Sequence, residues 1–158
     1  MTFVSTGNLN LPIKKILKSF NSVKINKIEL SGGIYNKNIK KTLSEYNQTT
    51  FSIHNYFPVQ KDGIVLNLAS LDKNISQKSL DFMFNSIKLA SSLGLRYYSF
   101  HAGFRINPSI NQLGKKIENG LIVQDRNKSI KEFIKNVGKL EKFASSKKVQ
   151  LLIENNVC

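Results

Sequence analysis

Short apolar runs alternate along this chain with longer stretches in which apolar residues recur every three to four positions. The runs are rich in β-branched and aromatic side chains, a composition typical of β-strands. They cover residues 2–5, 27–30, 50–53, 97–100 and 149–153. The longer stretches have the periodicity of amphipathic helices. This alternation predicts an α/β fold with a parallel sheet and right-handed crossover connections.

Helices are expected between the strands. Pro12 suits the first turn of the first helix, and a second covers residues 39–46. Ser76 is expected to cap the third helix, which Gly94 ends as the residue after the C-cap. The fourth helix is expected to turn one apolar face inward. That face consists of Ile130, Phe133, Ile134, Val137, Leu140 and Ala144.

Length and composition indicate one domain. The chain has 158 residues, and 41% of them are hydrophobic, which suits a single core and argues against disorder. No apolar run approaches the length of a membrane span, and the first residues lack the layout of a signal peptide. The single cysteine, Cys158, excludes an internal disulfide, so the reducing cytoplasm is the expected compartment.

The net charge of +14 raises the question of nucleic-acid binding. Only Arg96, Arg105 and Arg126 provide the forked guanidinium group that reads guanine or clamps phosphate. The lysines are spread along the whole chain, without a basic tail or a repeated basic–aromatic motif. The pattern therefore favours a general compositional bias over a specific nucleic-acid surface.

Polar residues end three of the predicted strands. His54, His101 and Glu154 each follow a short apolar run directly. Because the carboxyl ends of parallel strands meet at one rim, these side chains are expected to lie together. Histidine and glutamate are suitable ligands for a divalent metal ion. The alternatives are histidines in structural turns and an ion pair between Glu154 and a lysine.

Other polar residues near the strand ends are weaker candidates. Glu29 lies inside the second strand, where it either contacts substrate or forms a structural salt bridge. Asn155 and Asn156 suit hydroxyl binding or loop capping. Arg105 is a candidate for phosphate binding, with a solvated loop arginine as the alternative.

Five motifs at successive strand ends together resemble the xylose isomerase-like (β/α)8 barrels. This superfamily contains sugar-phosphate isomerases and epimerases and also endonuclease IV. The resemblance extends from the first strand to Glu154, and the motifs are IELSGG (28–33), HNYFP (54–58), VLNLAS (65–70), LGLRYYSFHAGF (93–104) and LLIENN (151–156).

The resemblance implies that residues 1–158 form the N-terminal part of a TIM barrel, with about five parallel strands and their crossover helices. It implies a divalent metal ion (Mn, Mg, Co or Zn) held by Glu154, His101 and His54, with Glu154 also taking part in proton transfer. Substrate contacts are then expected from both histidines and from Glu29, Asn155 and Arg105. The implied substrate is a small sugar or sugar phosphate.

The barrels of this family have eight strands, and counterparts of their later metal ligands and second proton-transfer carboxylate are missing here. The expectation is therefore an isomerase- or epimerase-like chain that is inactive alone and that self-associates or is completed by a partner. One alternative is an endonuclease IV-like, metal-dependent phosphodiesterase acting at abasic sites. Another is a non-catalytic binding remnant or one half of a hetero-complex.

Overall fold

One parallel sheet organises the chain. The structure is a computed structural model that describes residues 2–112 and 121–154. The sheet has five strands whose order in space follows their order in sequence. They are β1 (Val4–Ser5), β2 (Lys27–Leu30), β3 (Thr50–His54), β4 (Tyr97–His101) and β5 (Gln150–Glu154). The predicted α/β class with a parallel sheet is confirmed, and the strand ends fall within two residues of the predicted ones.

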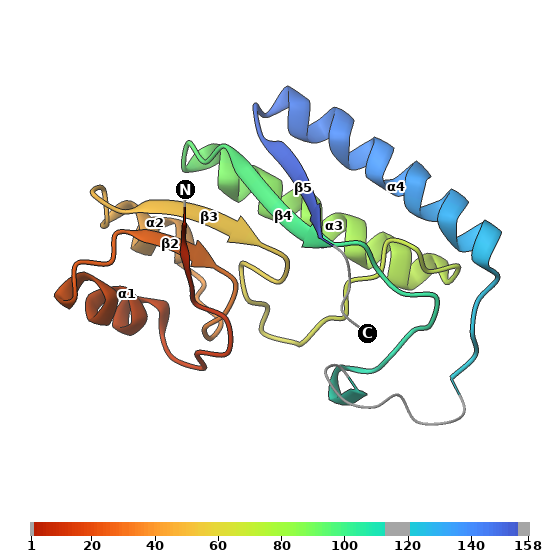
Figure 1. Cartoon of the computed structure of the whole chain (residues 1–158), viewed down its shortest axis with the longest axis horizontal. Helices are drawn as coiled ribbons and strands as arrows, with labels where there is room; N and C mark the ends of the chain where they lie inside the picture. Colours follow the sequence, from red (N-terminus) through yellow and green to blue (C-terminus); the bar gives the residue numbers. More distant parts are fainter. Residues whose placement is uncertain (1, 113–120, 155–158) are drawn as a thin grey trace.

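The helices connect consecutive strands. They are α1 (Ile13–Ser22), α2 (Ile39–Ser44), α3 (Lys73–Ser92) and α4 (Arg126–Ser146), with a short 3-10 turn, η1, at Ile110–Gln112. Because every crossover joins neighbouring strands with the same hand, the helices lie on one side of the sheet, as the arrangement of α2 and α3 behind the strands shows (Figure 1). None of the helices in the described ranges is long and apolar enough to cross a membrane.

The start of α3 differs from the prediction. Its N-cap is Asp72, whose carboxylate accepts hydrogen bonds from the backbone N–H groups of Asn74 and Ile75. Ser76, the predicted cap, lies inside the first turn and is buried. The end of the helix agrees with the prediction, since Gly94 has a φ of 67°, a left-handed conformation that glycine adopts without strain.

The strand register gives the sheet two different faces. Side chains alternate along a strand, so residues paired across neighbouring strands lie on the same face. The face that packs on the helices is apolar and includes the fully buried residues Ile28, Ile53 and Phe100. The other face carries the polar residues Ser5, Glu29, Ser52, His54, Ser99, His101 and Glu154.

The inward face of α4 is only partly as predicted. Leu140 and Ala144 are buried, and Phe133 and Val137 pack against the core from half-buried positions. Ile130 and Ile134 are exposed by 44% and 63%, which contradicts the prediction. The buried positions on this side of the helix are polar instead and belong to Ser129 and Asn136. Asn136 reaches that position because its amide donates to the Leu68 carbonyl and the Ser76 hydroxyl, both 2.9 Å away.

An apolar edge remains open at one side of the sheet. Within the described residues, β5 pairs only with β4, and its Leu152 and Ile153 are exposed by 41% and 49%. The exposed Ile130 and Ile134 lie on α4, the helix that leads into β5. Unpaired strand edges with apolar side chains promote association with other chains.

We therefore predict concentration-dependent self-association through this edge. Ile134→Lys combined with Ile153→Lys should shift the protein toward monomer, since both charges would have to be buried on association. Sedimentation velocity over a range of protein concentrations measures the effect. Val23→Lys, at a 65% exposed position beyond α1, is the matched control. An equal shift in that control would show that the edge is not responsible.

Candidate metal and substrate site

The three strand-end residues lie together, as the sequence predicts. His54 Nε2 is 3.1 Å from His101 Nε2, and the Glu154 carboxylate is 3.6 Å from His54 Nδ1 and 3.9 Å from His101 Nε2. The register explains this arrangement, since His101 pairs directly with Glu154 and His54 pairs with Ser99, two residues before His101. No lysine forms an ion pair with Glu154 in the part of the chain that the structure describes.

Ser99 fixes the orientation of the His54 ring. Its hydroxyl lies 2.9 Å from His54 Nδ1, and Ser99 is 8% exposed. A proton on Nδ1 that is donated to this hydroxyl leaves Nε2 with its lone pair toward His101. Metal-binding histidines usually donate their second ring N–H in this way, which sets both tautomer and ring direction. Ser99 is not recognisable from the sequence, because a serine inside an apolar strand belongs to no known motif.

Burial makes His54 resist protonation. Loss of solvent lowers the pKa of His54 below its ordinary value of 6.5, and the nearby His101 acts in the same direction. The carboxylates of Glu154 and Glu29 oppose this effect by favouring the charged ring. The side chain of His54 is 15% exposed, against 39% for His101 and 51% for Glu154. The neutral ring is the form of histidine that can bind a metal ion.

The donor set fits a divalent metal ion. Each of the three residues offers one ligand atom, and these atoms lie within 4.8 Å of one another. Two nitrogens at ordinary zinc distances from one tetrahedral ion are about 3.3 Å apart, close to the separation of the two Nε2 atoms. Two histidines and one carboxylate also form a common protein shell of catalytic metals, which leaves further positions for water or substrate.

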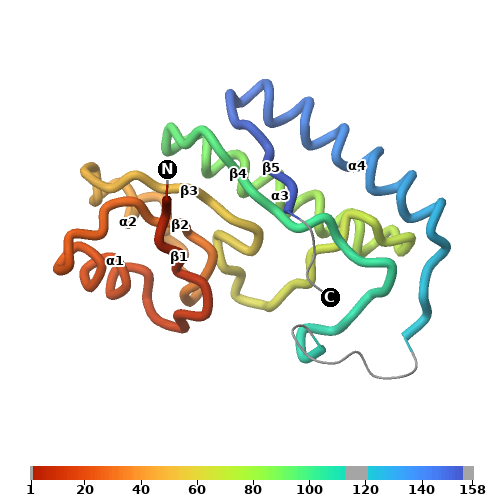
Figure 2. Tube along the Cα trace, in the orientation of Figure 1, coloured from red at the N-terminus to blue at the C-terminus, as the bar shows by residue number. Residues whose placement is uncertain are grey.

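Asn67 holds together the loops that follow β3 and β4, which leave the sheet on the same side (Figure 2). Its fully buried side chain accepts hydrogen bonds from the backbone N–H groups of Ala69 and Phe104 and donates to the Ile106 carbonyl. Gly103 makes this approach feasible, because a Cβ there would lie 2.9 Å from Asn67 Oδ1. Asn67 therefore positions the loop after His101. Asn67 lies within the VLNLAS motif, but no role for it was predicted from the sequence.

The other residues predicted to contact substrate are not part of the cluster of His54, His101 and Glu154. Glu29 is half-buried on the polar face, close enough to His54 to affect its pKa. The Arg105 guanidinium donates from Nε and Nη2 to the Gln124 carbonyl at 3.2 and 3.1 Å, so it braces the loop after β4. Asn155 and Asn156 lie outside the described residues.

The sequence and fold agree with known proteins. A family model described as xylose isomerase-like TIM barrel matches residues 19–156. This chain belongs to the xylose isomerase-like TIM barrel family. A relative named "Probable endonuclease 4" from Thermosipho melanesiensis is 31% identical over 104 residues, or 63% of this chain.

Solved structures of the family share the fold. A D-tagatose 3-epimerase-like protein superposes with a TM-score of 0.70 over 98% of this chain, at 16% identity. The 3-keto-D-glucoside 4-epimerase of E. coli gives 0.65 over 96% of the chain, at 10% identity. The chain spans 53% and 54% of these two proteins, and 34% of the endonuclease relative. The five strands therefore correspond to part of a TIM barrel.

The depressed pKa of His54 predicts a pH dependence of stability. As pH falls through about 6.5, the unfolded chain protonates this histidine while the folded chain resists, so the free energy of unfolding should decrease toward the lower folded pKa. Urea denaturation between pH 5 and 8 should show a shallower dependence for His54→Gln than for the wild type. Asn47→Gln, at an exposed position in the turn between α2 and β3, is the control, because it leaves His54 and the charged groups around it unchanged. An unchanged slope in His54→Gln would contradict the assignment.

Proposed function

We propose that this chain forms the N-terminal part of a metal-dependent isomerase or epimerase acting on a small sugar or sugar phosphate. The single observation that carries the proposal is the cluster of His54, His101 and Glu154 at one rim of the sheet. Structural neighbours named as epimerases of D-tagatose, L-ribulose and D-psicose support small ketoses as substrates. A neighbour from Thermus thermophilus, described as soaked with ZnCl2, is consistent with metal binding.

Each residue has a role that follows from its position. His54 and His101 would hold a metal ion through a ring nitrogen each, and the Ser99 hydroxyl, 2.9 Å from His54 Nδ1, would leave Nε2 of His54 free for that role. Glu154 would also hold the metal ion and, as the only carboxylate of the cluster, would be the group that moves the proton next to the sugar carbonyl. The metal ion, when bound, polarises that carbonyl. Glu29 contributes negative charge on the same face, where it is suited to orient a sugar hydroxyl.

Two further substrate contacts belong to the proposal. Asn155 directly follows Glu154 and offers an amide to a sugar hydroxyl. Arg105 stands on the loop after β4, where a bound phosphate would compete with the Gln124 carbonyl for its guanidinium group. Because these hydrogen bonds to Gln124 would be lost on binding, Arg105 would bind a phosphate less tightly than an arginine without such partners.

We predict weak metal binding and no turnover for the isolated chain. The cluster supplies one carboxylate. Epimerisation removes a proton from one face of a sugar carbon and adds a proton to the other face, which needs a second proton donor. Titration calorimetry with Mn²⁺, Co²⁺ and Zn²⁺ should detect binding that weakens at least about tenfold in Glu154→Gln, because a charged ligand is lost. Aldose–ketose interconversion and 3-epimerisation should be absent for both proteins.

Two contrary outcomes of this experiment have different meanings. Metal-dependent turnover that disappears in Glu154→Gln would show that five strands suffice and that the chain is active alone. Metal binding that is equal in the two proteins would contradict the site itself. Glu45→Gln is the matched control, since Glu45 pairs with Lys14 at 2.8 Å, away from the cluster.

An abasic-site endonuclease is the second candidate function. It is favoured by the 31% identity to the protein named "Probable endonuclease 4" and by the net charge of +14. The same three residues would then hold a metal ion that activates water toward a phosphodiester bond. The chain has only three arginines among its 158 residues, which disfavours specific recognition of damaged DNA.

We predict that the chain does not distinguish abasic from intact DNA. Binding of matched abasic and intact duplexes should be equal and should decline together as salt increases, because unspecific phosphate contacts release counterions. Fluorescence anisotropy between about 50 and 200 mM salt measures this. A preference for the abasic duplex that persists at the higher salt would favour the endonuclease over the isomerase.

A further inference from the structure

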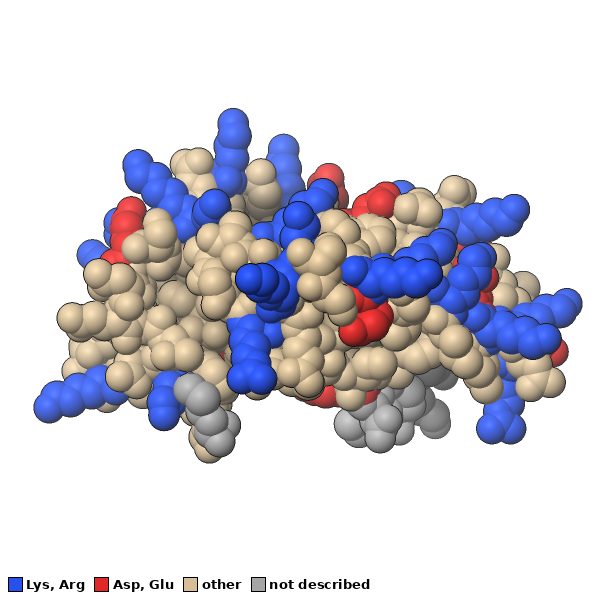
Figure 3. Space-filling model, turned by 90° about the horizontal axis from the view of Figure 1, so that it is seen from above, with Lys and Arg blue, Asp and Glu red and all other residues tan. Residues whose placement is uncertain are grey.

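The folded chain gathers lysines that are scattered in the sequence onto one face of α4. At 100° per residue, the lysine positions of this helix fall within an arc of about 80° and extend over about 21 Å of its length. All of them are exposed. We call this set the lysine face, and it consists of Lys128, Lys131, Lys135, Lys139 and Lys142. Figure 3, which looks onto the side where α4 lies, shows basic side chains projecting over this whole side of the molecule, with several acidic side chains between them.

The lysine face is largely uncompensated. Neighbours on it are three or four residues apart, a spacing at which like charges on a helix repel. Glu132 neutralises Lys135, with a separation of 3.1 Å between Oε2 and Nζ. The other four lysines form no ion pair within the described residues. Glu141, the other acid of α4, lies about 120° around the helix from the centre of the lysine face. An anionic partner would relieve this repulsion.

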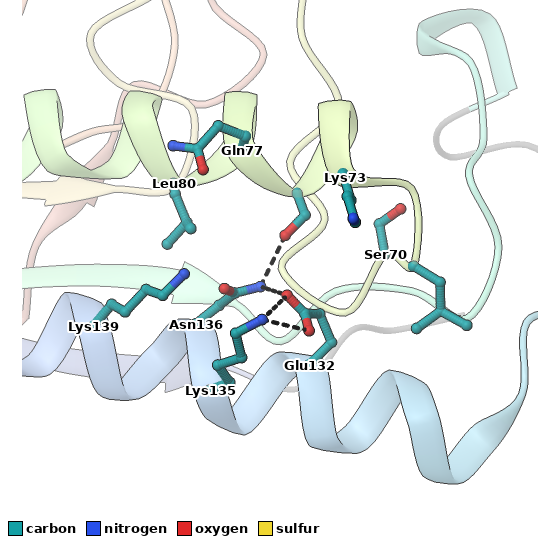
Figure 4. A pocket seen from close by; sticks show the side chains of 10 residues that line it. Ser70, Lys73, Gln77, Leu80, Glu132, Lys135, Asn136 and Lys139 are labelled. Carbon is teal, nitrogen blue, oxygen red and sulfur yellow. Dashed lines mark hydrogen bonds and ion pairs between the residues drawn. The ribbon is translucent and has the colours of Figure 1, made fainter.

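A hollow of about 290 Å³ borders the lysine face between α3 and α4 (Figure 4). Lys135 and Lys139 line it from α4, and Lys73 lines it from the first turn of α3. Gln77 adds an amide group. The floor is rigid, because the buried Asn136 donates hydrogen bonds to the Leu68 carbonyl and the Ser76 hydroxyl and so joins the two helices. Glu132 also lines the hollow, where its carboxylate pairs with Lys135. Lys73 and Lys139 then leave the lining with a net positive charge, which suits a phosphate group.

The pattern on α4 favours a nucleic acid over a membrane. A helix that lies on a membrane places its cations beside an apolar face that enters the lipid. On α4 the exposed Ile134 and Ile130 lie about 100° and 140° around the helix from the centre of the lysine face. A row about 21 Å long matches about six phosphates of one nucleic-acid strand at 3.4 Å each. Lysine ammonium groups, unlike arginine forks, contact phosphates without reading bases.

We propose that the lysine face of α4, together with the hollow beside Lys73, binds the phosphate backbone of a nucleic acid without sequence specificity. The lysine face lies on the helix layer, whereas His54, His101 and Glu154 lie at the strand ends on the opposite face of the sheet. The two sites are therefore independent, and the inference does not rest on the proposed isomerase chemistry.

The test compares two variants of equal charge. The first carries Lys131→Gln, Lys139→Gln and Lys142→Gln on the lysine face. The matched control carries Lys15→Gln, Lys18→Gln and Lys40→Gln, which are exposed positions on α1 and α2. Both lower the net charge by three, and circular dichroism confirms folding. Anisotropy of a labelled single-stranded oligonucleotide is measured at several salt concentrations.

The lysine-face variant should bind about tenfold more weakly at low salt, and its slope of log affinity against log salt should be shallower by about 2, since three phosphate contacts are lost. The control should keep the slope of the wild type. Equal weakening of both variants would show that net charge alone is responsible and would overturn the proposal. So would the absence of oligonucleotide binding, or binding only to vesicles rich in phosphatidylserine, which would identify a lipid partner instead.

Discussion

The parallel register of β3, β4 and β5 is the constraint on which the candidate site depends. His101 pairs with Glu154 and His54 pairs with Ser99, so all four side chains share one face of the sheet. Because side chains alternate with a period of two, a slip of one residue in either pairing would turn a member of the cluster toward the helices. The apolar face opposes such a slip, since Ile53 and Phe100 would then leave the core.

The sequence predicts the strands and their ends well, because both are local features. The run before His101 is mostly aromatic, with Ser99 as its one polar residue, and His101 marks the end of the strand. The cap of α3 was harder to predict, since Asp72 and Ser76 are both good N-cap residues and only the path of the preceding loop decides between them. The orientation of α4 also escaped prediction. Its apolar periodicity favours a face that includes Ile130 and Ile134, whereas the observed face buries Asn136, whose amide donates hydrogen bonds to the Leu68 carbonyl before α3 and to the Ser76 hydroxyl within α3.

The supporting residues of the site could not be found from the sequence, because their partners are distant in it. Ser99 contacts a histidine 45 positions earlier, and Asn67 contacts Phe104, which is 37 positions later. Each looks ordinary in its own segment, as a serine within a strand or an asparagine in a loop. Their roles arise only when the sheet brings the loops after β3 and β4 to the same side. The lysine face of α4 is the opposite case: its spacing is local, but it is visible only when the helix is considered as a wheel.

The cluster of His54, His101 and Glu154 is partly exposed, so metal binding there is coupled to whether another chain covers the polar face of the sheet. Glu154 is 51% exposed, so water can solvate its charge, whereas His54 is 15% exposed and already held neutral by burial. Any further chain or partner that covered this face would remove water from the Glu154 carboxylate. Burial of an unpaired carboxylate is costly, and the two histidines compensate only if they become protonated, which burial disfavours. A divalent ion resolves the conflict, because it balances the carboxylate while both rings stay neutral. Enclosure of the site should therefore strengthen metal binding, and metal binding should in turn favour enclosure.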